Sequence, residues 1–164
     1  MRLVLGAAVV AVVVGATTTG NRMPTATCSD SIEIIGEPPP PADTLVLGRV
    51  RMPRPDEVLQ LAPPASRGAP RFAKRGFSVT PGTSVVLVVP RRYRRLYGLA
   101  AGRGRLGAPA LRLRPCPAYV KPWTSWAGGY VARKPVCVWL VVRADGRAAR
   151  VPLNIGRRCA RIVR

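Results

Sequence analysis

The feature that most constrains the fold is the segment Pro135–Cys159, in which two apolar-rich runs flank the dipeptide Asp145-Gly146. A two-residue type I′ turn needs positive φ at both central positions, which Gly and Asp tolerate, so this dipeptide predicts a β-hairpin. With the dipeptide at the tip, the residues that face each other on one side are all apolar: Val142 and Ala149, Leu140 and Val151, Val138 and Leu153, Val136 and Ile155. A one-residue slip would move these side chains to the other face, so turn and pattern predict one register.

Other short apolar runs, separated by Gly and Pro, predict further strands. They are Thr44–Met52, Phe77–Thr80, Ser84–Val89 and Ala110–Arg114, with a short strand or helical turn at Asp56–Leu61. Ser84–Val89 is the most β-branched run and is expected to be a central strand buried on both faces. Arg150–Ile155 is expected to be an edge strand, because Pro152 lacks an N–H. We therefore expect an all-β, disulfide-containing fold, either a small antiparallel β-sandwich (immunoglobulin-like) or an open barrel of about 6–8 strands.

The N-terminus has the pattern of an export signal. Met1-Arg2 precedes the apolar run Leu3–Ala16, and small residues follow where a signal peptidase could cut. We expect a signal peptide over residues 1–20, a flexible Pro-rich tether over 21–43 and a β-sandwich domain over 44–164. An uncleaved membrane anchor is the competing interpretation of the leader. The expected location is extracytoplasmic, secreted or tethered to the outer face of the cytoplasmic membrane.

The four cysteines fit an oxidising compartment, where one or two disulfides are expected. The candidates are Cys28, Cys116, Cys137 and Cys159. None has C-x-x-C spacing, so no metal site is expected. The hairpin register places Cys137 opposite Asn154 and argues against a direct bridge to Cys159, although a bend at Gly156 would permit one. We expect Cys116 to pair with one of these two and Cys28 to be the odd member, with lipidation of Cys28 as a further possibility.

Composition disfavours the commonest kinds of catalysis. The chain has no His, and from Val58 onward one carboxylate, Asp145, faces twenty-two Lys and Arg residues. Enzymes that depend on carboxylate pairs or on a His-based triad are therefore disfavoured, and we expect no catalytic residues and no cofactor. The net charge of +20 will attract polyanions. The excess of Arg over Lys favours recognition of phosphate, sulfate or carboxylate, although a GC-rich genome would also produce it.

The densest basic cluster follows the Ser84–Val89 run and supplies the candidate anion-binding residues. These are Arg91, Arg92, Tyr93, Arg94 and Arg95. The arginines could hold anionic groups while Tyr93 stacks on a ring. The alternative is a charged strand end or turn.

A second candidate surface is an aromatic segment with Tyr119, Trp123, Trp126 and Tyr130. In a loop, Trp123, Trp126 and Tyr130 would form a stacking platform or the centre of an interface. In a small sandwich, such residues also serve as core side chains. The adjacent Gly128-Gly129 predicts a bulge or a place where something approaches the backbone closely.

The C-terminal part, R-P-C-P, W-A-G-G-Y-V, P-V-C-V-W-L-V-V and G-R-R-C, resembles uncharacterised exported or lipid-anchored β-domain proteins of high-GC Gram-positive bacteria. The resemblance covers about the last fifty residues, implies export and a β-domain, and carries no catalytic motif.

These features together favour a non-enzymatic cell-envelope protein that binds an anionic partner, such as a wall polymer, a lipid head group or an acidic protein. A biological role in nucleic-acid binding is not expected, because no module signature supports it. A membrane is expected as a partner only through the leader or a lipid on Cys28. The alternative function is an assembly module that docks on another envelope protein through the aromatic segment or an edge strand.

Overall fold

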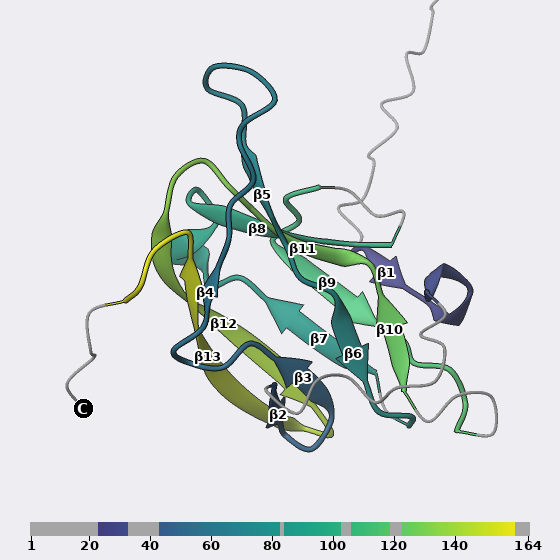
Figure 1. Ribbon diagram of the computed structural model, residues 1–164. Coiled ribbons are helices and arrows are strands. Elements are labelled where there is room, and N and C mark those ends of the chain that lie inside the picture. Colours follow the sequence, from purple (N-terminus) through teal and green to yellow (C-terminus); the bar gives the residue numbers. More distant parts are fainter. Residues whose placement is uncertain (1–22, 33–42, 83, 103–105, 119–122, 160–164) are drawn as a thin grey trace, which may run out of the picture.

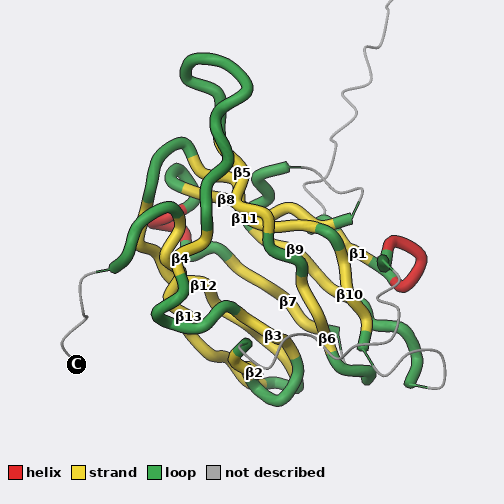
Figure 2. Tube along the Cα trace, viewed as in Figure 1, coloured by secondary structure: helices red, strands yellow, loops and turns green. Residues whose placement is uncertain are grey.

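The structure is a computed structural model that describes residues 23–32, 43–82, 84–102, 106–118 and 123–159 (Figure 1). Its strands are β1 (Thr25–Ala26), β2 (Thr44–Val46), β3 (Val50–Met52), β4 (Val58–Leu59), β5 (Arg71–Lys74), β6 (Phe77–Val79), β7 (Val85–Val88), β8 (Tyr97–Ala101), β9 (Ala110–Leu113), β10 (Thr124–Trp126), β11 (Gly128–Ala132), β12 (Val136–Ala144) and β13 (Arg147–Ile155). Two 3₁₀ turns, Cys28–Asp30 and Arg91–Tyr93, are the helical segments drawn in red in Figure 2.

The strands form three sheets around one core. The largest sheet has the order β1-β9-β7-β12-β13-β4, and the smaller sheets have the orders β10-β6-β3-β2 and β5-β11-β8. Figure 1 shows the largest sheet curling around the core, with the smaller sheets packed across it. The expectation of an all-β, disulfide-containing fold is confirmed. The thirteen strands of the described residues exceed the number expected because several of them span only two or three residues.

The β12–β13 hairpin has the predicted register. Val142 pairs with Ala149, and the pairing continues to Val136 and Ile155 at the open end. At the tip, Asp145 has φ 50° and Gly146 has φ 69°, as a type I′ turn requires. The inward-facing residues of β12 from Val136 to Ala144 are buried, so the hairpin forms one wall of the core.

Strand β7 is central, as predicted, because it pairs with both β9 and β12. Its inward side chains Val85 and Leu87 are fully buried, whereas Val86 and Val88 on the other face are half-buried. The prediction that both faces are buried is therefore wrong. A continuous β-branched run does not distinguish a strand covered on two faces from one covered on a single face.

The predicted single strand Thr44–Met52 is instead a tight hairpin of β2 and β3. The turn residues Leu47 and Gly48 have φ of 53° and 67°. Gly48 supplies the left-handed conformation that the turn needs, so one glycine inside an apolar run divides the strand into two.

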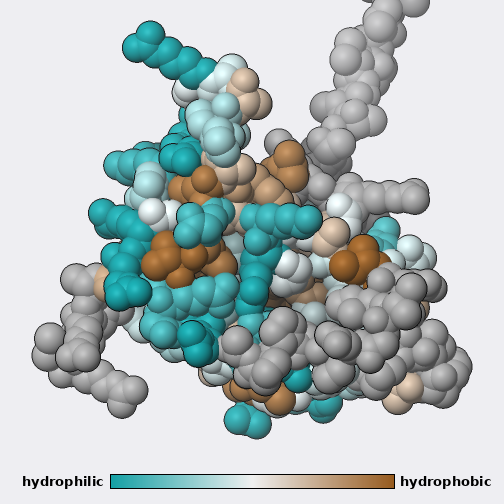
Figure 3. Space-filling view, in the orientation of Figure 1, coloured by the Kyte–Doolittle hydropathy of each residue, from teal (hydrophilic) through white to brown (hydrophobic). Residues whose placement is uncertain are grey.

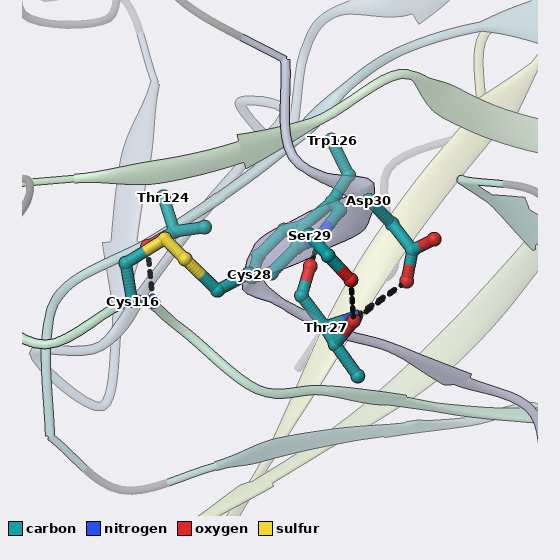
Figure 4. Close-up of a disulfide and its surroundings, with 7 residues drawn as sticks. All are labelled: Thr27, Cys28, Ser29, Asp30, Cys116, Thr124 and Trp126. Atoms are coloured by element: carbon teal, nitrogen blue, oxygen red, sulfur yellow. Dashed lines mark hydrogen bonds between the residues drawn. A yellow bond between two sulfur atoms is a disulfide. The ribbon is translucent and has the colours of Figure 1, made fainter.

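The segment preceding β2 is part of the folded domain where it is described. Strand β1 pairs in parallel with β9, and Cys28 forms a disulfide with Cys116. Figure 4 shows Trp126 beside the 3₁₀ turn Cys28–Asp30, and its indole Nε1 donates to the carbonyl oxygen of Thr27 at 2.7 Å. Residues 23–32 of the expected tether therefore belong to the domain, and the rest of the tether up to residue 42 lies outside the described residues.

The disulfide also overturns the prediction that Cys28 is the odd cysteine. Its sulfur is bonded to Cys116, so it is not free to carry a lipid. The capping interaction in which the Thr27 N–H donates to Asp30 Oδ2 at 3.0 Å stabilises the turn that presents Cys28.

Cys137 is bonded to Cys159, against the expectation drawn from the hairpin register. Gly156, with φ 70°, turns the chain back over the end of the sheet. The Cys159 N–H then donates to Oδ1 of Asn154 at 3.1 Å, which holds the returning segment in place. The two disulfides are consistent with an extracytoplasmic location.

Strand β13 is an edge only in part. Asn154 and Ile155 pair in parallel with Val58 and Leu59 of β4, so the end of β13 is covered. Pro152, one of the residues before this pairing, lies opposite Trp139. The edge prediction therefore holds for the segment before Asn154 and is wrong for the last two residues.

The Gly128-Gly129 pair allows close packing of strands, which agrees with the second of the two predicted alternatives, a close approach to the backbone. A Cβ on Gly128 would lie 2.3 Å from the Ala100 carbonyl oxygen in β8, and one on Gly129 would lie 2.0 Å from the Ala73 carbonyl oxygen in β5. Strand β11 pairs with both of these strands, so the absence of side chains allows the three-stranded sheet to form.

The proposed leader, residues 1–20, lies outside the described residues. In the part of the chain that the structure describes, none of the helical segments is long and apolar enough to cross a membrane.

Removing the two disulfides is expected to have unequal effects. The Cys28–Cys116 bond spans 88 residues and the Cys137–Cys159 bond spans 22. Because the entropy lost from the unfolded chain grows with the closed loop, replacing both cysteines by alanine should lower the free energy of unfolding by about 4–5 kcal/mol in the first case and about 3 kcal/mol in the second. Urea denaturation of each double variant measures this, and the reverse order would contradict it.

The substitution Gly129→Ala should destabilise the protein by about 3 kcal/mol or more, because the new methyl group would force β5 and β11 apart. Gly146→Ala is the matched control: it also has positive φ but has no atom within 4 Å of the added Cβ, so about 1–2 kcal/mol is expected. Equal midpoints in urea would show that the close approach at Gly129 does not limit stability.

Candidate anion-binding site

The arginine cluster lies on a compact turn between β7 and β8. The Tyr93 N–H donates to the Pro90 carbonyl oxygen, and the Leu96 N–H donates to the Tyr93 carbonyl oxygen, both at 2.8 Å. The four arginines predicted as anion-binding residues, Arg91, Arg92, Arg94 and Arg95, are all exposed on this turn. The turn therefore carries four exposed arginines within five consecutive residues, and Nε of Arg94 also donates to the Val89 carbonyl oxygen at 3.3 Å.

Tyr93 does not offer a free ring for stacking. Its side chain is half-buried and packs against the hydrophobic core. The guanidinium carbon of Arg92 lies 4.6 Å from the ring centroid, which is cation–π distance. The tyrosine thus anchors the turn and orients Arg92, so its predicted role in ligand stacking is not supported by its position.

A pocket of about 230 Å³ lies beside this turn and is lined by three arginines. Arg94 and Arg95 come from the turn, and Arg133 comes from the end of β11. None of the lining residues is acidic. The backbone forms part of the pocket where Gly98 and Gly107 meet, because a Cβ on Gly98 would lie 2.4 Å from the Gly107 carbonyl carbon. The structure thus adds Arg133, which was not among the predicted anion-binding residues, to Arg94 and Arg95 of the predicted cluster.

The carboxylates of the described residues are used elsewhere. Asp43 and Glu57 both pair with Arg75. The remaining ion pairs join Asp145 to Arg49 at 2.6 Å and Asp56 to Arg54 at 3.4 Å. None of these pairs involves an arginine of the turn, so its charge is not neutralised by a carboxylate of the described chain.

The ion pairs of Arg75 show that two carboxylates can lie together in this domain, although only one carboxylate follows Val58 in the sequence. Asp43 and Glu57 come from segments that precede Val58, and the fold brings both to the same guanidinium. Arg75 lies between strands β5 and β6, so this ion pair joins three separate segments. Counting acidic residues along the sequence does not show that two of them bind the same arginine in the fold.

Two of the three predicted stacking residues are core residues. Trp126 and Tyr130 are fully buried, and Tyr130 packs edge-on against Phe77 with ring centroids 5.8 Å apart. Their predicted role as an exposed interface is therefore wrong, and the alternative of core side chains is correct. Trp123 is half-buried, with the Arg51 guanidinium carbon 4.5 Å from its ring. Tyr119 lies outside the described residues.

The face of the molecule shown in Figure 3 is largely hydrophilic. Figure 3 shows hydrophilic side chains over much of the face in view, with a hydrophobic area over β4 and several smaller, separate ones elsewhere. The alternative function, docking on another protein through the aromatic segment, is less well supported, because Trp126 and Tyr130 of that segment are buried in the core.

Burial raises the pKa of Tyr97 and of Tyr130 well above the ordinary value of about 10. The phenol oxygen of Tyr97 donates to the Trp139 carbonyl oxygen at 2.7 Å. The Tyr130 oxygen is buried and has no hydrogen-bond partner. These tyrosines therefore remain neutral in the fold and belong to its structural core.

The described residues contain no group of three or more His, Cys, Asp or Glu side chains that could hold a metal ion. No known protein-family model matches this chain, and a search of curated proteins found no match. The site is therefore interpreted from its own geometry.

Stability should fall as the pH rises above about 10, because the unfolded state ionises its tyrosines there while buried Tyr97 and Tyr130 stay protonated. Tyr130→Phe should reduce the slope of this loss by up to about 1.4 kcal/mol per pH unit and should leave stability at pH 7 equal or higher, because the lost hydroxyl has no partner.

Tyr97→Phe is the comparison, since it removes a hydrogen bond to Trp139 and should cost about 1 kcal/mol at pH 7. Thermal or urea unfolding from pH 7 to 11 measures both variants. A Tyr130→Phe variant with an unchanged alkaline slope would contradict the inference.

Proposed function

We propose that this protein is an exported, non-enzymatic β-domain protein of the cell envelope that binds an anionic partner through its arginine-rich surface. The observation that carries the proposal is a pocket that Arg94, Arg95 and Arg133 line together, with no acidic residue among its lining. Planar guanidinium groups bind carboxylate, sulfate and phosphate in a bidentate manner, which suits such a pocket to an anionic group.

The remaining arginines of the turn extend this site. Arg91 and Arg92 are exposed beside the pocket residues in the sequence and add to the same positive field. Because the net charge is +20, long-range attraction will bring polyanions to the surface, and the pocket supplies the local contacts that hold one group in place. The partner class is an anionic wall polymer, a lipid head group or an acidic protein.

Export is supported by the apolar leader pattern Leu3–Ala16 and by the two disulfides, which persist in oxidising compartments. The resemblance to exported or lipid-anchored β-domain proteins of high-GC Gram-positive bacteria rests on the C-terminal segments and supports the same location. The absence of His from the chain and the use of four carboxylates in ion pairs favour binding over catalysis.

A salt series with three defined polyanions tests the proposal: teichoic acid, poly-glutamate and vesicles that contain phosphatidylglycerol. The triple variant Arg94→Gln/Arg95→Gln/Arg133→Gln should lose at least tenfold in affinity for one of them at physiological salt, because each charge-assisted hydrogen bond contributes about 1.5–3 kcal/mol. The logarithm of the binding constant of the wild-type protein should fall linearly with the logarithm of salt concentration.

The matched control is Arg143→Gln/Arg147→Gln/Arg150→Gln, which removes the same charge from exposed positions on the β12–β13 hairpin. An equal loss in the control and the pocket variant would mean that net charge alone drives binding. Affinity that does not change with salt would overturn the electrostatic proposal itself.

A further inference from the structure

A second groove, of about 410 Å³, lies on the outer face of the largest sheet and shares no lining residue with the arginine pocket. Trp139 of β12 and Pro152 of β13 are a cross-strand pair in this groove. Both side chains are half-buried, and they lie on the face opposite to the core residues of the hairpin. An aromatic ring and a proline ring therefore stand side by side at the surface.

The other wall of the groove consists of the segment that follows β13. Arg157 and Arg158 are exposed and line the groove together with the Cys137–Cys159 disulfide. Gly156 turns this segment back toward the sheet, and the disulfide attaches it to the residue two positions before Trp139. Two guanidinium groups are thereby placed beside the paired rings.

Hydrogen bonds of buried side chains hold the segments that form the groove in place. Nδ2 of Asn154, which is 2 % exposed, donates to the carbonyl oxygens of Pro55 and Glu57 at 2.8 and 3.0 Å. Its Oδ1 accepts the N–H of Cys159 at 3.1 Å. The Trp139 backbone is held through its carbonyl oxygen by the Tyr97 hydroxyl. A preformed site of this kind loses little conformational entropy when it binds a ligand.

The chemistry of the lining selects a class of ligand. The flat indole ring of Trp139 and the apolar ring of Pro152, beside polar donors, suit a molecule that has an apolar face and a polar rim, as a pyranose ring has. The two arginines add preference for an attached carboxylate or sulfate, and no residue of the lining is acidic. The volume lies within the range of about 300–1,000 Å³ that is usual for small-ligand sites.

We propose that the groove formed by Trp139, Pro152, Arg157 and Arg158 binds an anionic saccharide, with a sugar ring against Trp139 and its acidic group on the arginines. This site is separate from the arginine pocket and does not depend on it. It would add recognition of ring shape to a surface whose other contacts are electrostatic.

The test uses the purified oxidised protein and a tetrasaccharide of alternating glucuronate and N-acetylglucosamine, with chitotetraose as the neutral analogue and polyphosphate as the anion without a sugar ring. Titration calorimetry measures affinity and tryptophan fluorescence reports contact with an indole. The acidic tetrasaccharide should bind at least tenfold more tightly than chitotetraose, and polyphosphate should not displace it at equal charge concentration.

Two variants separate the contributions. Trp139→Leu should lower the affinity for the acidic tetrasaccharide at least tenfold and abolish the fluorescence change. Arg157→Gln/Arg158→Gln should remove the preference over chitotetraose, and because both arginines are exposed, this variant leaves the core intact. The variant Arg94→Gln/Arg95→Gln/Arg133→Gln should bind the tetrasaccharide as the wild type does.

The proposal is overturned if Trp139→Leu, shown to be folded by its circular dichroism, binds as the wild type does, or if polyphosphate competes fully for the site. A loss of tetrasaccharide binding in the Arg94/Arg95/Arg133 variant alone would assign the ligand to the arginine pocket and would also contradict the proposal.

Discussion

The antiparallel pairing of β12 with β13 is the interaction on which the rest of the fold depends. It joins nine residue pairs, from Ala144 and Arg147 at the tip to Val136 and Ile155 at the open end. Strand β7 adds to one side of this hairpin and β4 to the other, so the hairpin lies within the largest sheet. One face supplies core residues, and the other carries Trp139 and Pro152 to the surface. Because the register determines which residues face inward, it also determines the position of the groove that Trp139 and Pro152 line.

Features that depend on neighbours in the chain could be predicted, and those that depend on distant segments could not. The hairpin register followed from one turn dipeptide and an alternating pattern. In the predicted strand Ala110–Arg114, Leu111 and Leu113 alternate with arginines and are buried. The disulfide between Cys28 and Cys116 could not be inferred, because it depends on the parallel pairing of β1 with β9. No local sequence pattern predicts a two-residue strand that pairs with a segment far along the chain.

The candidate site was predictable in part for the same reason. Arg94 and Arg95 belong to a visible cluster, whereas Arg133 reaches their pocket only because β11 pairs with β8. Composition does not predict which aromatic residues are buried. Trp126 and Tyr130 are buried and Trp139 is half-buried, although all three lie in β-forming sequence. Strand alternation identifies the outward position of Trp139 once the hairpin register is known, and this was the available signal for the groove.

The position of β1 has a consequence for how the exported chain folds if it emerges from the membrane N-terminus first. Thr25 and Ala26 emerge long before their partners Arg112 and Leu113, and Cys28 precedes Cys116 by 88 residues. The first strand of the domain therefore has no partner until most of the chain is present. The outermost strand of the largest sheet is added late, and the thiol of Cys28 must stay reduced or be protected from wrong partners in the interval. A topology with so many non-local pairings is expected to fold slowly.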